Sequence, residues 1–228
     1  MPKSRNISMA VIRRLPKYNR CLRDLLDKEI YRISSKELSG ILGFTASQIR
    51  QDLNNFGGFG QQGYGYNVEE LHHEIQKILG LTKDYNAVVV GVGNLGQAIA
   101  NHTNFEKHGF KILAMFDINP TLIGLQIRGT PVYDMKELGE FIKENNIEIG
   151  VITTPKEVAQ SVAEELVEAG IKAIWNFAPV DLKVPEDVVV EDVHLNESLF
   201  IMSYLIKEKE MLKDLEKEED GKDRENEK

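Results

Sequence analysis

An apolar run followed by closely spaced glycines constrains the fold of this chain more than any other stretch. Ala87 to Val90 is short, apolar and mostly β-branched, which is typical of a strand buried on both faces. Gly91, Gly93 and Gly96 follow it with the spacing G-x-G-x-x-G. In that spacing the first glycine permits a tight turn, the second lets the backbone approach a pyrophosphate, and the third lets the next helix pack closely.

A second apolar run ends in an acidic residue, Asp117, which lies 21 residues after Gly96. A carboxylate at this place accepts hydrogen bonds from ribose hydroxyl groups and repels a 2′-phosphate. No arginine follows it in Ile118-Asn119-Pro120. The pattern predicts a Rossmann dinucleotide site that prefers NAD(H) to NADP(H). The other interpretation is a glycine-rich turn in a different α/β fold.

Apolar runs then alternate with helical patterns as far as residue 193. Strands are expected at 111–117, 127–132, 149–153, 171–176 and 188–193, and helices at 95–104, 135–145 and 155–169. This alternation predicts an α/β domain with a doubly wound parallel sheet.

Charge separates this part of the chain from the part before it. Residues 1–83 carry 13 Lys and Arg against 8 Asp and Glu, whereas residues 84–228 carry 15 against 28. A basic module joined to an acidic one is compatible with nucleic-acid binding by the basic module alone. No apolar run approaches the roughly 18 residues of a membrane span, and no signal-peptide core begins the chain. A single cysteine, Cys21, excludes an intramolecular disulfide and indicates a cytoplasmic location.

Two capped helices lie close together in the basic part. A capping box formed by Ser34 and Glu37 opens a short helix, and one formed by Thr45 and Gln48 opens a helix that runs to about Asn55. A glycine turn joins the two helices, which is the outline of a helix-turn-helix.

The second of these helices is polar on most of its surface. Ala46, Ile49 and Leu53 can face a core, and the side chains left for the outside are Ser47, Gln48, Arg50, Gln51 and Asn54. Such side chains hydrogen-bond base edges and phosphates, although an ordinary solvated helix face accounts for them equally.

Five glycines among residues 57–66 alternate with aromatic residues after this helix. The pattern predicts a β-hairpin around Gln61-Gln62, and a hairpin in this place is the wing of a winged helix. A flexible loop is the alternative. A helix at 68–79 closes the module, and 80–86 forms a linker.

A last helix is predicted at 195–212, with an apolar side that needs a partner because the sheet is already complete. Of the 22 residues 207–228, 17 are charged, and the stretch beyond about Leu215 is predicted to be disordered.

Taken together, these motifs resemble the Rex family, redox-sensing transcriptional repressors that read the NADH/NAD+ ratio. The resemblance covers about residues 5–206. It rests on Ile12-Arg-Arg-Leu-Pro-Lys-Tyr18, Ile49-Arg-Gln-Asp-Leu53, Phe59-Gly-Gln-Gln-Gly-Tyr-Gly-Tyr66, Phe116-Asp-Ile-Asn-Pro120 with Ile123-Gly124, and Trp175-Asn-Phe-Ala-Pro-Val180.

The resemblance implies a homodimer that binds an inverted-repeat operator in double-stranded DNA. NADH closes this dimer and releases the DNA, whereas NAD+ permits binding. The implied organisation is a winged helix-turn-helix domain at 1–80, a Rossmann NAD(H)-binding domain at 81–193, a dimerisation helix swapped between subunits at 194–212, and a charged disordered tail at 213–228.

The motifs and the resemblance give two sets of site residues. DNA-binding residues are expected on the basic first helix, the second helix of the helix-turn-helix and the wing: Arg13, Arg14, Lys17, Ser47, Arg50, Gln51, Gly60, Gln61 and Tyr64. Cofactor-binding residues are expected at Gly91, Val92, Gly93, Asn94, Leu95, Gly96, His102, Asp117, Ile118, Thr153, Thr154, Asn176, Phe177 and Ala178.

Two positions depart from the family pattern. In the family an aspartate pairs with an arginine of the first helix when NADH is bound, and here the pair is His194 and Arg20. His102 stands where a tyrosine is common. A carboxylate binds a guanidinium through two charge-assisted hydrogen bonds, whereas a neutral histidine accepts at most one. The chain is therefore expected to be a repressor that senses NADH/NAD+, or a Rex-like repressor that has lost or altered this response.

Two other functions stay open. One is a small NAD-dependent oxidoreductase, although only about 110 residues follow Asp117 and the sheet and last helix occupy them. The other is an NAD-binding scaffold that has lost its DNA contacts. No metal site is expected, since His72, His73 and His108 lack companion ligands. No enzymatic activity is expected, since a dehydrogenase needs a substrate domain for which the chain has no room.

Overall fold

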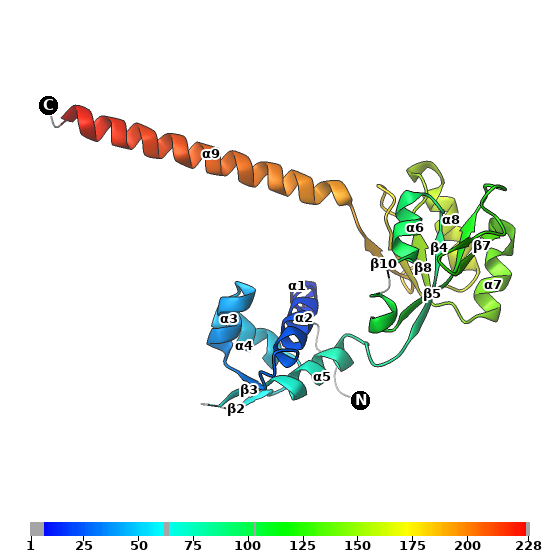
Figure 1. Ribbon diagram of the computed structural model, residues 1–228, viewed down its shortest axis with the longest axis horizontal. Helices are drawn as coiled ribbons and strands as arrows, with labels where there is room; N and C mark the ends of the chain where they lie inside the picture. Colours follow the sequence, from blue (N-terminus) through cyan, green and yellow to red (C-terminus); the bar gives the residue numbers. More distant parts are fainter. Residues whose placement is uncertain (1–6, 62–63, 103, 227–228) are drawn as a thin grey trace. The chain divides into compact units, whose positions relative to one another are not determined.

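The computed structural model describes residues 7–61, 64–102 and 104–226 (Figure 1). The chain divides into two compact units, residues 1–84 and 85–228. The sequence places this boundary four residues earlier, at residue 80. Gln62 of the predicted hairpin lies outside the described residues.

The first unit has the winged-helix pattern of helices and short strands. Its helices are α1 (Met9–Ile12), α2 (Leu15–Leu26), α3 (Ser35–Leu42), α4 (Ala46–Asn54) and α5 (Val68–Ile78). Its strands β1 (Arg32–Ile33), β2 (Gly60–Gln61) and β3 (Gly65–Asn67) form an antiparallel sheet in the order β1-β3-β2. The predicted wing therefore forms a β-hairpin, β2 with β3.

The core of this unit is made by the apolar sides of its helices. Leu15, Tyr18 and Leu22 of α2 are buried against Ile49 of α4 and Leu71 of α5, among others. The predicted capping box of α3 is present, because Ser34 and Glu37 bond each other reciprocally. The second box is only half formed. Thr45 accepts the Gln48 N–H at 3.1 Å, but the side chain of Gln48 bonds Asp52 instead.

The second unit is built on a seven-stranded sheet in the order β10-β9-β8-β4-β5-β7-β6. The strands are β4 (Tyr85–Val90), β5 (Phe110–Asp117), β6 (Gln126–Ile127), β7 (Thr130–Asp134), β8 (Ile149–Ile152), β9 (Ala173–Asn176) and β10 (Val189–Asp192). Neighbouring strands are parallel except β6 and β7. The predicted single strand at 127–132 is thus wrong. Arg128 and Gly129 have φ of +49° and +92°, and they turn the chain into a tight hairpin.

Helices cover both faces of this sheet, as the sequence predicts (Figure 1). They are α6 (Asn94–Ala100), α7 (Leu138–Glu144) and α8 (Lys156–Glu168), with short 3-10 turns at Glu106–His108 and Met135–Glu137. Val88 and Val90 of β4 belong to the core that includes residues of α7 and α8. Val89 belongs to the core on the other face, which includes Ile99 of α6.

The last helix, α9, spans Leu195–Asn226 and carries exposed apolar side chains over its first part. It extends beyond Leu212, where the predicted helix ends, through most of the stretch that was predicted to be disordered. The reason is the composition of that stretch, because Lys and Glu are strong helix formers. None of the described helices has the length and apolarity needed to cross a membrane.

Candidate functional site

The glycine loop connects β4 to α6 at the carboxyl edge of the parallel strands. Gly91 has φ of +98°, and a Cβ there would lie 3.1 Å from the backbone of Thr153. At Gly96 a Cβ would overlap the carbonyl oxygen of Gly91 and come within 2.8 Å of Thr153 Oγ1. A Cβ at Gly93 would meet open space, so this part of the loop is free for a ligand to approach. The three glycines thus have the roles that the motif predicts: Gly91 permits the tight turn, Gly96 permits close packing of α6, and Gly93 leaves room for a pyrophosphate.

Asp117 ends β5 beside this loop and is tied to it. Its Oδ2 accepts the Val92 N–H at 2.7 Å, and its Oδ1 accepts the Asn119 N–H at 2.9 Å. Each oxygen keeps further acceptor capacity, so the half-buried carboxylate can still receive ribose hydroxyl groups. Gln97, which sequence reasoning missed, donates to the Val92 carbonyl at 2.9 Å and also holds the loop.

Thr153 and Thr154 follow β8 on the other side of the glycine loop. The Thr153 hydroxyl donates a hydrogen bond to the Gly91 carbonyl oxygen at 2.8 Å. This bond holds the glycine loop in place. The Thr154 hydroxyl oxygen is buried and has no hydrogen-bond partner within the described part of the chain. A buried hydroxyl without a partner is costly, and a bound ligand that bonds it would remove the cost. The residues present therefore fit a dinucleotide, which Gly91, Gly93, Asp117 and Thr154 would hold.

Asn176 at the end of β9 is fully buried, and its amide is used within the protein. Its Nδ2 donates to the Val180 carbonyl at 2.8 Å and to Asp192 Oδ1 at 2.7 Å, and its Oδ1 accepts the Ala178 N–H at 3.0 Å. It shapes the turn that carries Phe177. That Asn176, Phe177 or Ala178 touches the cofactor directly stays a prediction, as it does for Asn94, Leu95 and the exposed Ile118.

His102 lies beyond the end of α6, in a row of aromatic rings. The His102 ring packs edge-on against the Phe105 ring, with 4.6 Å between the ring centres. The centres of the Phe105 and Trp175 rings are 5.6 Å apart, and those of the Trp175 and Phe177 rings are 4.6 Å apart. This row links His102 to the Phe177 turn through ring contacts. A role for His102 at the cofactor stays a prediction.

The outer side of α4 presents polar side chains, as expected of a DNA-reading helix. Ser47, Arg50 and Gln51 are exposed. The Arg50 guanidinium donates to Ser35 Oγ at 2.9 Å, so α3 supports the arginine. At the wing, Tyr64 is 69% exposed. The guanidinium carbon of Arg32 lies over its ring, 5.8 Å from the ring centre. Neither Ser35 nor Arg32 was predicted, since nothing in their local sequence indicates these partners.

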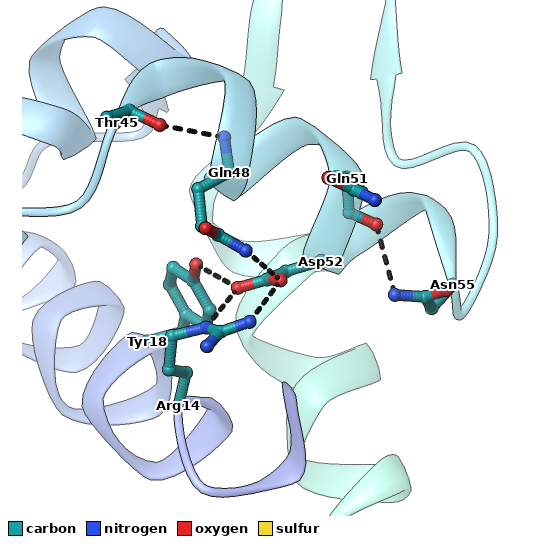
Figure 2. Close-up of polar contacts among 7 residues, drawn as sticks. All are labelled: Arg14, Tyr18, Thr45, Gln48, Gln51, Asp52 and Asn55. Atoms are coloured by element: carbon teal, nitrogen blue, oxygen red, sulfur yellow. Dashed lines mark hydrogen bonds and ion pairs between the residues drawn. The ribbon is translucent and has the colours of Figure 1, made fainter. Parts of the chain in front are cut away.

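The inner side of α4 carries a buried ion pair that sequence reasoning missed (Figure 2). Asp52 is 1% exposed, and its carboxylate accepts two bonds from Arg14, the N-cap residue of α2, from Nε at 2.6 Å and from Nη2 at 2.7 Å. The Tyr18 hydroxyl donates to it at 2.8 Å, and Gln48 Nε2 donates at 3.3 Å. Arg14 and Gln48, both predicted to face outward, are engaged inside the unit. Whether Arg14 also reaches DNA stays a prediction.

This cluster shifts the ionisation of its members. Burial alone would raise the pKa of Asp52, but the bonds from Arg14, Tyr18 and Gln48 outweigh it and hold the pKa below its ordinary value. Burial and the hydrogen bond to Asp52 raise the pKa of the Tyr18 hydroxyl well above its usual range. The hydrogen bond to Asp52 raises the pKa of Arg14. At neutral pH the cluster is thus an ion pair with a neutral tyrosine.

The remaining predicted residues are placed as follows. Arg13, Lys17 and Arg20 are exposed on α1–α2. His194 lies just before α9, with Nε2 3.5 Å from Asp181 Oδ1. A pairing of Arg20 with His194 between subunits stays a prediction, as do the DNA contacts of Gly60 and Gln61. In the described ranges no group of three or more His, Cys, Asp and Glu side chains could hold a metal ion.

Comparison with known proteins links both units to one family. The model "Putative DNA-binding protein N-terminus" matches residues 6–54, and the model "CoA binding domain" matches residues 82–180. The redox-sensing transcriptional repressor Rex of Clostridioides difficile (strain 630) is 68% identical over 205 residues, which are 90% of this chain and 98% of that protein. The Rex of Caldanaerobacter subterraneus subsp. tengcongensis is 62% identical over 218 residues, 96% and 97% of the two chains.

Solved structures give the same result. RSP in complex with beta-NAD+ and operator DNA has a TM-score of 0.87 at 60% identity, covering 93% of this chain and 98% of that one. RSP in complex with beta-NADH has a TM-score of 0.85 at 57% identity, covering 93% and 100%. RSP is described as a Rex-family repressor.

A winged-helix unit joined to a dinucleotide-binding Rossmann unit defines a DNA-binding regulator. The chain belongs to the Rex family of redox-sensing transcriptional repressors. Since these relatives are named repressors, the oxidoreductase and scaffold interpretations are set aside.

Proposed function

We infer that this chain is a transcriptional repressor that binds an inverted-repeat operator and responds to the NADH/NAD+ ratio. The observation that carries the inference is the pairing of two features in one chain. The exposed polar side of α4 suits the reading of bases, and the glycine loop with Asp117 suits a dinucleotide. The relative RSP was solved with NAD+ and operator DNA and with NADH, which supports the assignment of both.

The chain's own residues divide the work at the cofactor site. Gly91 and Gly96 keep the loop close to β4 and leave room over Gly93 for a pyrophosphate. Asp117 receives ribose hydroxyl groups and disfavours a 2′-phosphate, so NAD(H) is bound in preference to NADP(H). The bound dinucleotide supplies the signal, because its nicotinamide ring differs in charge and shape between NADH and NAD+.

The test is a titration of the operator duplex of the RSP complex against the protein, repeated with NADH and with NAD+. Specific binding that NADH weakens and NAD+ permits is the expected result. Arg50→Ala should weaken operator binding by about 1–3 kcal/mol, roughly 5–150-fold, if Arg50 bonds a guanine edge. Arg50→Lys keeps the charge without the paired donors and should recover only part of the loss.

The outcomes separate the alternatives. Equal affinity for the operator and a scrambled duplex would contradict the repressor assignment. Operator binding that bound NADH leaves unchanged would indicate a repressor with an altered redox response, as His102 and His194 suggest. An Arg50→Ala variant with unchanged affinity would contradict the role of α4.

We infer in addition that the protein is a homodimer in which α9 packs on a second copy. Leu199, Phe200, Ile201 and Met202 are each more than half exposed in the single chain. An apolar cavity of about 300 Å³ lies along β4, β8 and β9, lined by Ala87, Ile149 and Trp175 among others. Apolar surface of this extent is typical of an interface between proteins.

Light scattering on truncated chains tests this assembly. A chain that ends before Leu195 should be monomeric or aggregated, whereas a chain without residues 215–228 should remain a dimer. A stable dimer of the shorter chain would contradict the swapped helix. The cytoplasmic location stays a prediction that accords with a DNA partner.

A further inference from the structure

The buried cluster of the first unit lies directly behind the proposed DNA-reading surface. Asp52 points inward from α4, and Arg50 is about 200° away around the helix, at 3.6 residues per turn. Any rotation of α4 therefore moves Arg50 and Asp52 together. What holds the carboxylate of Asp52 also sets the direction of the arginine.

The bonds of Asp52 are directional and come from two sides. Arg14 bonds both carboxylate oxygens through two nitrogens of one planar guanidinium, at 2.6 and 2.7 Å (Figure 2). Tyr18 donates one further bond to Oδ2 of Asp52, and Gln48 donates one to Oδ1. A bidentate pair fixes orientation as well as distance, which an apolar contact does not.

Arg14, the N-cap residue of α2, and Tyr18 of α2 also contact the chain just before α4. Phe44 comes directly before the N-cap residue Thr45. The Tyr18 ring lies 5.9 Å from the Phe44 ring, and the Arg14 guanidinium lies 5.9 Å from its centre. Thr45 and Asp52 are about 10 Å apart along the axis at 1.5 Å per residue. Thus the start of α2 is held both to the residue before the N-cap of α4 and to Asp52 near its end.

We propose that Arg14 and Tyr18 are positioning residues for operator recognition, which orient α4 through Asp52 and Phe44. The proposal rests on the proposed function, because it requires that α4 reads DNA. Contacts to base edges depend on the exact direction of the donors, whereas contacts to phosphates carry no sequence information. Loss of the cluster should therefore reduce operator affinity much more than affinity for unrelated DNA.

The experiment replaces the cluster without leaving a buried charge. The variant Arg14→Met/Tyr18→Phe/Asp52→Leu removes every charged and hydroxyl group of the pair at similar volume, and such replacements often keep or raise stability. Asp52→Asn is the second variant, since it keeps the shape, removes the charge and replaces one acceptor oxygen by an NH2 donor. Affinity is measured for the operator duplex of the RSP complex and for a scrambled duplex of equal length. Circular dichroism and thermal unfolding report whether each variant is folded.

Wild type should prefer the operator, and both variants should lose about tenfold or more of this preference, the scale of one lost base contact. The control Glu74→Gln/Lys77→Gln removes an exposed ion pair of the same unit and should leave the preference unchanged. A folded triple variant with the wild-type preference would overturn the proposal, because a merely structural cluster is replaceable by apolar packing. A wild type without any preference would instead contradict the proposed function.

Discussion

Asp52 in the first unit and Asp117 in the second are both carboxylates beside a candidate ligand surface, but their bonding differs. Asp52 is 1% exposed and accepts four side-chain bonds, two of them from one arginine. Asp117 is half-buried and accepts two backbone N–H bonds. Asp52 thus has its acceptors filled by the protein, whereas Asp117 retains capacity for a ligand.

The difference shows how bonding separates a framework carboxylate from a ligand-binding one. A buried charge must be compensated within the fold, so its partners are fixed and its loss destabilises the unit. A carboxylate aligned by backbone N–H groups keeps its direction before the ligand arrives, which lowers the cost of binding. Removal of partners should therefore affect stability at Asp52 and affinity at Asp117.

The largest effect is expected for Arg14→Ala. It leaves the Asp52 carboxylate buried without its main partner, which costs about 3–5 kcal/mol of unfolding free energy. Urea unfolding followed by far-ultraviolet circular dichroism should show the first unit unfolding earlier. Trp175, the only tryptophan, lies in β9 of the second unit, and its fluorescence should report an unchanged transition.

The matched control is Lys77→Ala, which breaks the exposed pair with Glu74 in the same unit. Exposed pairs contribute about 0–1 kcal/mol, so this variant should unfold nearly as wild type does. If Arg14→Ala were no less stable than Lys77→Ala, the buried pair would not hold the unit together.

The two carboxylates also differ in how far the sequence predicts them. Asp117 ends an apolar run that follows the glycine motif, so its local context indicates its place at the sheet edge. The partners of Asp52 lie 34 and 38 residues earlier in the chain, and a lone acid on a polar helix gives no sign of them. The pattern of Ile49 and Leu53 predicts the core face of α4, but not that Asp52 shares it.

Other differences have similar causes. The run 127–132 was predicted as one strand because its apolar ends hide the turn at Arg128-Gly129. The Gln48 side chain was assigned to a capping box by spacing alone, and its bond to Asp52 depends on the tertiary fold. The parallel, doubly wound arrangement of the sheet and the close packing at the glycines follow from local rules, and both were predicted.

A smaller effect is expected for Asp117→Ala. Hydrogen bonds between charged groups and hydroxyls contribute about 1.5–3 kcal/mol, so NADH affinity should fall by roughly tenfold or more. NADPH affinity should fall less, since the repulsion of its phosphate is also removed, and the preference for NADH should narrow. Calorimetry with both cofactors measures the two affinities.

The exposed acid Asp187 of the same unit provides the control for this change. Asp187→Ala removes the same charge away from the glycine loop and should leave both affinities unchanged. Binding of NADPH as tight as that of NADH by wild type would contradict the assignment of Asp117. The thermal stability of Asp117→Ala should stay close to that of wild type, in contrast to Arg14→Ala.

The smallest expected effect is the loss of stability of the first unit at acidic pH. The bonds from Arg14, Tyr18 and Gln48 outweigh burial and hold the pKa of Asp52 below its ordinary value of 3.8. A carboxyl whose pKa is lower in the folded state stabilises the fold above its unfolded pKa, and this contribution is lost as the pH falls through the folded value. Unfolding free energies of wild type and Asp52→Asn should therefore differ by a constant amount well above pH 3.8, and the difference should shrink as the pH falls below that value. Other acids, such as Glu37, titrate in both proteins and cancel in the difference. A difference that stays constant down to pH 2 would show that the charge of Asp52 does not stabilise the unit, and the contrast with Asp117 would then rest on geometry alone.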